Sequence, residues 1–210
     1  EKADLEWFNY FQRLYDGGIK EYFINGNKNQ IEYLIDLTKE FEINIHGWVW
    51  TLNRPEDAIA IKNPDWYSVN RNGDNSYECR PYVDYYQWLS PFSNGARCHV
   101  KENIQYISKI DGIASVHLDY VRYCDIFLPK NLQKFYRITQ KYEMPEFDFG
   151  YHRNAREGFK KLHGIDPINI ENNIQKKKWN QYRLDAVTSL VNELKIITKE
   201  NNTNISAAVF

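Results

Sequence analysis

One acidic residue stands at the polar end of an apolar, β-prone run in residues 112–123, GIASVHLDYVRY. The run follows an amphipathic helical pattern, so we predict a strand in which His117 and Asp119 share one face. A carboxylate at the end of a buried strand costs free energy unless it is paired, and barrel enzymes place catalytic groups at that end. Asp119 is therefore a candidate catalytic carboxylate. The alternative is that Asp119 pairs with Arg122 or caps the next helix.

A partner carboxylate is required if the chemistry is hydrolysis of a glycosidic bond. In that reaction two carboxyl groups flank the bond, about 5 to 9.5 Å apart. Glu146 and Asp148 lie in the long loop after the Asp119 strand and are the candidates for this second catalytic role, while Asp84 is a weaker one. Loop carboxylates are more often solvated than catalytic, so each keeps that alternative.

Large rings with polar tips alternate along residues 44–52, NIHGWVWTL. Strand geometry places His46, Trp48 and Trp50 on one face. Such a face suits the floor of a ligand pocket better than it suits packing against a helix. Two alternatives remain: Trp48 fills the interior of a barrel, and His46 is a hydrogen-bonded core histidine.

Alternating helical and strand patterns position these residues. Helical periodicity occupies residues 5–15, 31–41, 96–110, 154–163 and 179–200, and β-prone runs occupy residues 19–24, 44–51, 116–120 and 205–209. Helices that alternate with strands over short connections predict an α/β fold with a parallel sheet, its four strands adjacent in chain order. The length of 210 residues predicts one domain, residues 1–210.

Two long excursions, residues 55–92 and 124–151, interrupt this alternation. Aromatic residues make up 16% of the chain, and many of them fall in these loops, which argues against disorder. Ordered loops beyond the carboxyl ends of parallel strands are where α/β enzymes build their sites. Flat rings in such loops can stack on ligands.

Composition and motifs exclude several classes of function. A net charge of −1, from 27 basic and 28 acidic residues, gives no electrostatic basis for binding nucleic acid or an anionic membrane. No stretch approaches the roughly 20 apolar residues that cross a bilayer. The three cysteines lack metal-ligand spacing, and no phosphate-binding, dinucleotide-binding or zinc-protease motif is present. We expect no metal and no cofactor, and the oligomeric state is left open.

Three motifs together resemble a known family. HGWVW in residues 46–50, YYQWLSP in residues 85–91 and DGIASVHLDYVRY in residues 111–123 are similar to segments of the family-10-type glycosyl-hydrolase-like proteins. That family implies a (β/α)8 TIM-barrel fold, an extracytoplasmic bacterial location and action on glycans, in some members on peptidoglycan. Asp119 matches the first of two aspartates that often end barrel strand four, but Tyr120 occupies the second position. Ser90 stands where asparagine is usual.

The resemblance also implies an incomplete barrel. It covers the first helix through strand five, about four βα units, so barrel strand one and the last three units are expected to be absent from this chain. A sheet that does not close leaves unpaired edge strands, so we expect the chain to be part of a larger protein.

The leading function is a glycoside hydrolase with Asp119 as nucleophile or general base, and with Glu146, Asp148 or a carboxyl group from the missing half of the barrel as acid. Arg122 would pair with Asp119 and keep it ionised. The residues expected to bind the carbohydrate substrate are His46, Trp48, Trp50, Asn53, Tyr82, Tyr86, Trp88, His117 and Arg122. The alternative is a carbohydrate-binding protein on the same scaffold without turnover. A metal-dependent barrel hydrolase is disfavoured because no His-x-His pair or acidic cluster lies near the strand ends.

Overall fold

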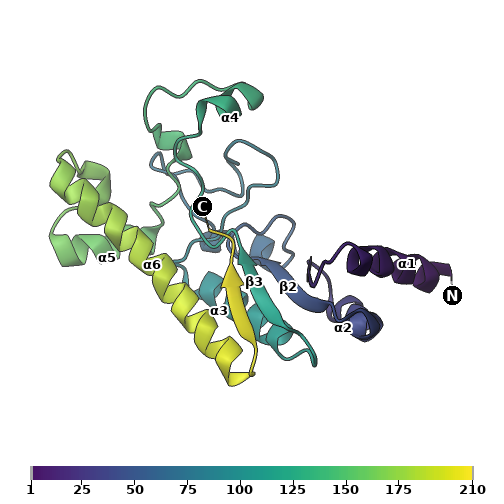
Figure 1. Ribbon diagram of the computed structural model, residues 1–210. Coiled ribbons are helices and arrows are strands. Elements are labelled where there is room, and N and C mark those ends of the chain that lie inside the picture. Colours follow the sequence, from purple (N-terminus) through teal and green to yellow (C-terminus); the bar gives the residue numbers. More distant parts are fainter. Residues whose placement is uncertain (1, 210) are drawn as a thin grey trace. The chain divides into compact units, whose positions relative to one another are not determined.

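A parallel β-sheet organises the computed structural model, which describes residues 2–209 (Figure 1). Within that range the sheet has four strands: β1 (Glu21–Ile24), β2 (Asn44–Trp50), β3 (Ser115–Asp119) and β4 (Asn204–Ala207). They are adjacent in chain order, and each neighbouring pair is parallel. The predicted order and direction are confirmed. β1, β2 and β4 are one or two residues shorter than their β-prone runs, whereas β3 has the predicted length and begins one residue earlier. Phe210 lies outside the described residues.

The contacts of the chain divide it into two compact units, each assembled from separate segments of the sequence. The first unit contains residues 2–50, 101–119 and 193–209, and it holds the sheet. The second unit contains residues 51–100 and 120–192, and it holds both long loops. That residues 1–210 act as one catalytic domain stays a prediction.

Six α-helices occupy the described residues: α1 (Lys2–Asp16), α2 (Lys28–Thr38), α3 (Asn94–Ser108), α4 (Lys130–Phe135), α5 (Arg153–His163) and α6 (Asn173–Glu200). The five predicted helices are confirmed. Local signals set their ends: Asn27 and Gln30 form a reciprocal capping box at the start of α2, and Gly164 closes α5 in the left-handed conformation at φ 76°.

Two features of the helices differ from the sequence-based prediction. Helix α6 starts at Asn173, well before residue 179, because the Asn172 side chain accepts the Gln175 N–H at 2.9 Å and caps it. The prediction instead began at Trp179, because the basic run of residues 176–178 was expected to precede the helix. The short helix α4 lies inside a segment expected to be loop, and it lacks an apolar period long enough to reveal it.

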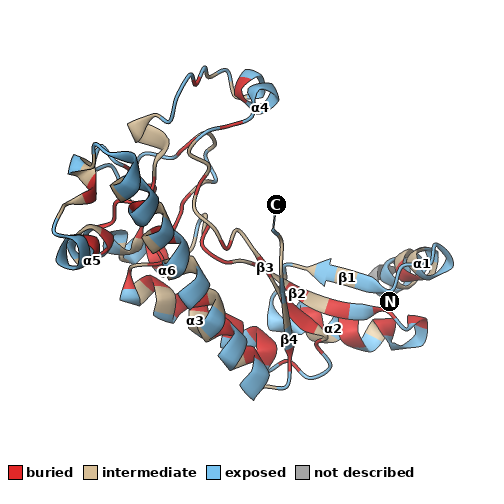
Figure 2. Cartoon of the chain, turned by 60° about the vertical axis from the view of Figure 1, so that its left-hand side comes forward, coloured by how far each residue is buried: buried red, intermediate tan, exposed pale blue. Residues whose placement is uncertain are grey.

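One face of the sheet packs against helices. Ile45, Val49, Val116 and Leu118 are all buried, in the alternation expected of β2 and β3. Gly47 shares this face, and a Cβ placed there would lie 2.6 Å from Cγ2 of Ile107 on α3. The glycine thus lets the helix approach the strand closely. Figure 2 shows the contrast between the mainly exposed edge strand β1 and the buried positions of β2.

The second unit has its own apolar cluster. Tyr151, Ala155, Phe159 and Trp179 are buried together between α5 and the first half of α6. The long loop of residues 55–92 is ordered by isolated bridges, including Asn53 with Trp88 and Tyr67 with Leu89. Short 3-10 turns punctuate the loops at Ala60–Lys62, Pro64–Trp66, Pro145–Phe147 and Pro167–Asn169, and a fifth, Lys39–Phe41, follows α2. Among the described residues, no helix combines the length and apolar character that crossing a membrane demands.

Candidate functional site

The face of the sheet opposite the helices carries polar and aromatic side chains, and we call it the polar sheet face. Alternation along the strands places on it Glu21, Phe23, His46, Trp48, Trp50, Ser115, His117, Asp119 and Ser206. The strand register aligns Trp48 with His117 and Trp50 with Asp119. Five of the residues predicted to form the site are therefore on one face of one unit: His46, Trp48, Trp50, His117 and Asp119.

Asp119 is the last residue of β3 and is held by the neighbouring strand. The indole N–H of Trp48 donates a hydrogen bond to Oδ2 of Asp119 over 3.1 Å. This bond fixes the orientation of the carboxylate, which is only partly buried. Tyr120, the next residue, has a left-handed backbone with φ 50°, a conformation that is costly for a bulky side chain and turns the chain sharply after the strand. Such strain is found most often at functional sites.

His46 is at the centre of a hydrogen-bonded row toward the other end of the strands. One ring nitrogen bonds Ser115 Oγ at 2.7 Å, and the other makes a short contact with the Glu21 carboxylate. Hydrogen bonds from His46 and then Asn44 lower the pKa of Glu21, so this carboxyl group is ionised at neutral pH. His46 is thus partnered on both sides, as the core-histidine alternative requires.

His117 lies between the row around His46 and the carboxylate of Asp119. Its Nδ1 bonds Ser206 Oγ at 2.9 Å, and the Phe23 ring packs on it edge-on at 4.8 Å between centroids. Burial lowers the pKa of His117 more than the charge of Asp119 raises it. At neutral pH the imidazole is therefore mainly uncharged, and it can accept or donate a hydrogen bond beside Asp119.

The other predicted site residues belong to the second unit, and several are part of its packing. Trp88 is 1% exposed, and Asn53 is fully buried, with its side-chain oxygen accepting the Gln87 N–H at 2.9 Å. The Tyr86 ring packs edge-on against Trp88, and the guanidinium of Arg122 lies 5.4 Å from the Trp88 ring centre. These residues therefore build the loop framework, and direct contact of Trp88 with a ligand stays a prediction.

Tyr82 packs against the 3-10 turn that carries Glu146 in the second unit. The Tyr82 hydroxyl donates to the Asp125 carbonyl at 2.7 Å, and its ring stacks flat on Phe147 at 4.5 Å. Burial raises the pKa of Tyr82, so the hydroxyl stays protonated. Glu146 is in the 3-10 turn Pro145–Phe147 and is half-buried. Its role as an acid stays a prediction.

Asp148 and Arg122 each have a charged partner in the second unit. Asp148 pairs with Arg183 at 2.5 Å, and both side chains are nearly buried, at 13% and 9% exposure. The guanidinium of Arg183 thus compensates the charge of the Asp148 carboxylate, and the role of Asp148 as an acid stays a prediction. Arg122 pairs with Asp125 at 3.0 Å. The pairing of Arg122 with Asp119 that the sequence suggested stays a prediction.

Sequence reasoning missed some of the residues that make the polar sheet face. Glu21 and Phe23 alternate in a short strand and could have been placed on one face, but the register that brings them to His46 was not readable. Residues 2–209 contain no group of three or more His, Cys, Asp or Glu side chains that could hold a metal ion.

Several solved structures with a fold similar to that of this chain are glycoside hydrolases. No family model matches the sequence, and no curated protein matches it. Among solved structures, a β-galactosidase from the haloarchaeon Halorubrum lacusprofundi aligns with a TM-score of 0.68 at 10% identity, over 96% of this chain and 34% of that one. A β-galactosidase from Marinomonas ef1 gives 0.64 at 10% identity with the same coverage. An α-L-fucosidase from Paenibacillus thiaminolyticus gives 0.59 at 11% identity, over 100% and 29%.

This chain therefore spans about a third of the length of the β-galactosidases that it matches. At this level of identity the likeness concerns the fold alone. The chain has a glycosidase-like α/β fold with a parallel sheet, consistent with an incomplete TIM-type barrel.

Proposed function

We propose that this chain is the part of a glycoside hydrolase of the family-10-type group that carries the catalytic nucleophile or base, Asp119. The observation that supports the proposal most is the position of Asp119 at the carboxyl end of β3, oriented by the Trp48 indole at 3.1 Å. Barrel enzymes place their reacting groups at this end of the strands. The motifs around residues 46–50, 85–91 and 111–123 support the same assignment, and so does the glycosidase-like fold.

The two carboxylates of the polar sheet face differ in the role that they can play. Glu21 pairs in register with Asn44, the first residue of β2, whereas Asp119 pairs with Trp50, the last one. The two are therefore at opposite ends of the sheet, and Glu21 is already bonded to His46. Asp119 is the carboxylate at the end where substrate binds in barrel enzymes, and Glu21 provides a matched control.

In the proposed reaction the Asp119 carboxylate attacks the anomeric carbon or activates a water, and a second carboxyl group protonates the leaving oxygen. The Trp48 N–H keeps one carboxylate oxygen in place. The neutral His117 beside Asp119 can hydrogen-bond a sugar hydroxyl. Trp50, in register with Asp119, offers a ring to the sugar face. The substrate would be a poly- or oligosaccharide, and we propose an extracytoplasmic location on the basis of the family resemblance.

The test compares Asp119→Asn with Glu21→Gln in the protein that contains this chain, using a panel of oligosaccharides. Asp119→Asn keeps the size of the side chain but removes the charge that an oxocarbenium-like transition state needs, so turnover should fall about a thousandfold while glycan binding persists. Glu21→Gln should keep most of the turnover. Near-wild-type turnover in a folded Asp119→Asn protein would show that another carboxylate carries the reaction.

A second function, carbohydrate binding without turnover, is favoured by one observation. Of the two predicted acids, Asp148 is held in a nearly buried ion pair with Arg183, which leaves Glu146 as the remaining candidate. If the wild-type protein binds oligosaccharides but releases no product from any of them, this second function replaces the first.

A further inference from the structure

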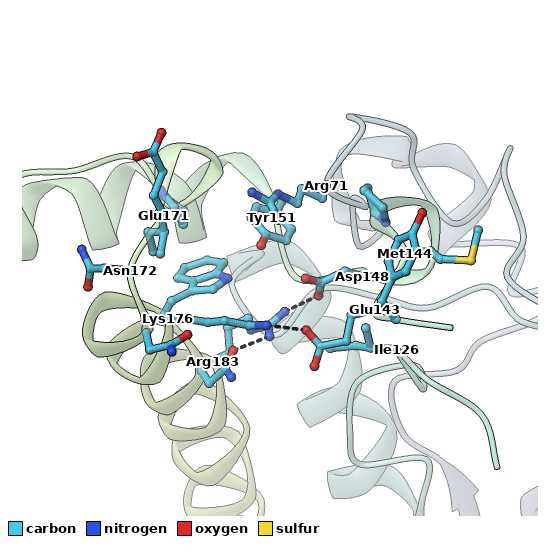
Figure 3. Close-up of a pocket in the computed structure, with 17 residues that line it drawn as sticks. Arg71, Ile126, Glu143, Met144, Asp148, Tyr151, Glu171, Asn172, Lys176 and Arg183 are labelled. Carbon is cyan, nitrogen blue, oxygen red and sulfur yellow. Dashed lines mark hydrogen bonds and ion pairs between the residues drawn. The ribbon is translucent and has the colours of Figure 1, made fainter. Parts of the chain in front are cut away.

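A pocket of about 520 Å³ lies wholly within the second unit and uses none of the residues of the polar sheet face (Figure 3). It is lined by the segment of residues 142–148, by Tyr151 and by the first turns of α6. Its volume is within the range of small-molecule sites, about 300 to 1,000 Å³. No step of the proposed hydrolysis requires it.

Charge in this pocket is balanced locally. Lys176 pairs with Glu143 at 2.6 Å and Arg183 pairs with Asp148 at 2.5 Å, and Figure 3 shows both pairs within the pocket. Arg71 and Glu171 add one charge of each sign. A pocket with compensated charge produces no strong net field, so it does not select an ion of either sign.

The polar groups of the lining include both donors and acceptors. Asn172 and Asn180 supply side-chain amides. The ion-paired carboxylates have further lone pairs that can accept hydrogen bonds from a ligand, and the ion-paired Lys and Arg side chains have further N–H groups that can donate. Burial raises the pKa of Tyr151 to about 12, so at neutral pH its hydroxyl is protonated and can donate. A ligand rich in hydroxyl groups matches this mixture, because each hydroxyl donates one hydrogen bond and accepts others.

Aromatic rings border the same pocket. Tyr142 stands at the rim with 68% of its surface exposed, while Trp179 is buried at the base. A flat, exposed ring next to compensated polar groups suits a sugar, which combines an apolar C–H face with hydroxyl groups; a purely apolar ligand has no hydroxyl groups to bond the polar lining.

We propose that this pocket binds a neutral saccharide, as a second carbohydrate site separate from the polar sheet face. Tyr142 stacks on one sugar ring, and the pairs Lys176–Glu143 and Arg183–Asp148, together with the amide of Asn172, hold its hydroxyls. The site does not depend on Asp119, so it can exist whether or not the protein cleaves glycans.

Isothermal titration of the whole chain tests this site, with cellotetraose, chitotetraose and galactotriose as neutral probes and trigalacturonate and inorganic phosphate as anionic ones. Saturable binding of at least one neutral probe is expected. Tyr142→Ala should weaken it about five- to tenfold, the usual size of a stacking contribution, and Glu143→Ala should weaken it as well. Both side chains are exposed, so neither change should unfold the protein.

Two comparison variants give the result its meaning. Tyr106→Ala removes a tyrosine that is 55% exposed on α3, outside the pocket, and should leave binding unchanged. Glu157→Ala removes an exposed, ion-paired carboxylate on α5, outside the pocket, and should also leave binding unchanged. The proposal is overturned if no neutral probe binds, if only the anionic probes bind, or if Tyr142→Ala has no effect.

Discussion

Asp148→Ala should destabilise the second unit, because it would leave the buried guanidinium of Arg183 without its carboxylate partner. Arg183 is nine-tenths buried, 2.5 Å from Asp148 and 2.8 Å from the Asn180 side chain, and its guanidinium lies within 6.0 Å of the Tyr151 and Trp179 ring centres. Removing one partner of a buried pair leaves an uncompensated charge and costs about 3 to 5 kcal/mol. Since Asn180 and the rings remain, we expect a loss of about 3 kcal/mol.

Thermal unfolding measures this loss. For a chain of this size, about 3 kcal/mol corresponds to a fall in melting temperature of roughly 6 to 12 °C. Glu157→Ala is the matched control, because it breaks the ion pair with Arg153 in which both side chains are largely exposed, and it should change the melting temperature little.

A double variant separates pairing from packing. Adding Arg183→Met to Asp148→Ala removes the stranded charge and keeps an apolar chain of similar length, so part of the lost stability should return. The reasoning is refuted if Asp148→Ala lowers the melting temperature no more than Glu157→Ala does. In that case Asp148 contributes little to the stability of the fold and becomes a stronger candidate for the catalytic acid.

Two other predictions concern single contacts. Burial alone would raise the pKa of Asp57, but hydrogen bonds from His99 and the Ala60 N–H and the charge of Arg54 outweigh it and hold the pKa well below its usual value. The stability that this carboxylate contributes is therefore complete above about pH 4 and is lost as the pH falls below that value. The difference in unfolding free energy between wild type and Asp57→Asn should then shrink in acid. A difference that stays constant from pH 7 to pH 2 contradicts this prediction. Gly47→Ala should lower the free energy of unfolding by about 1 to 3 kcal/mol, because its Cβ would meet Ile107 at 2.6 Å. Denaturant unfolding of the double variant should show that Ile107→Ala restores part of this loss. If the effects of the two substitutions simply add, the steric contact between residues 47 and 107 is not the cause.

The sequence alone determined the elements and the direction of the sheet. The spacing at which apolar residues recur distinguishes a helix from a strand. Helices that alternate with strands over short connections favour a parallel sheet whose strands follow chain order. The same alternation placed His46, Trp48 and Trp50 on one face of their strand, and His117 and Asp119 on one face of theirs, since side chains along a strand point alternately to opposite faces. All of these features are local, so they can be read from neighbouring residues.

Tertiary structure alone decided which side chains meet. Strand register brought Glu21 to His46 and Trp48 to Asp119, and register depends on packing between strands, which a single strand does not reveal. Asp148 and Arg183 are far apart in the sequence, and the fold joined them into a nearly buried pair. The sequence suggested that Asp148 is a catalytic acid or a solvated loop carboxylate. A carboxylate's role depends on its burial and its charged neighbours, and both arise only when distant segments pack together.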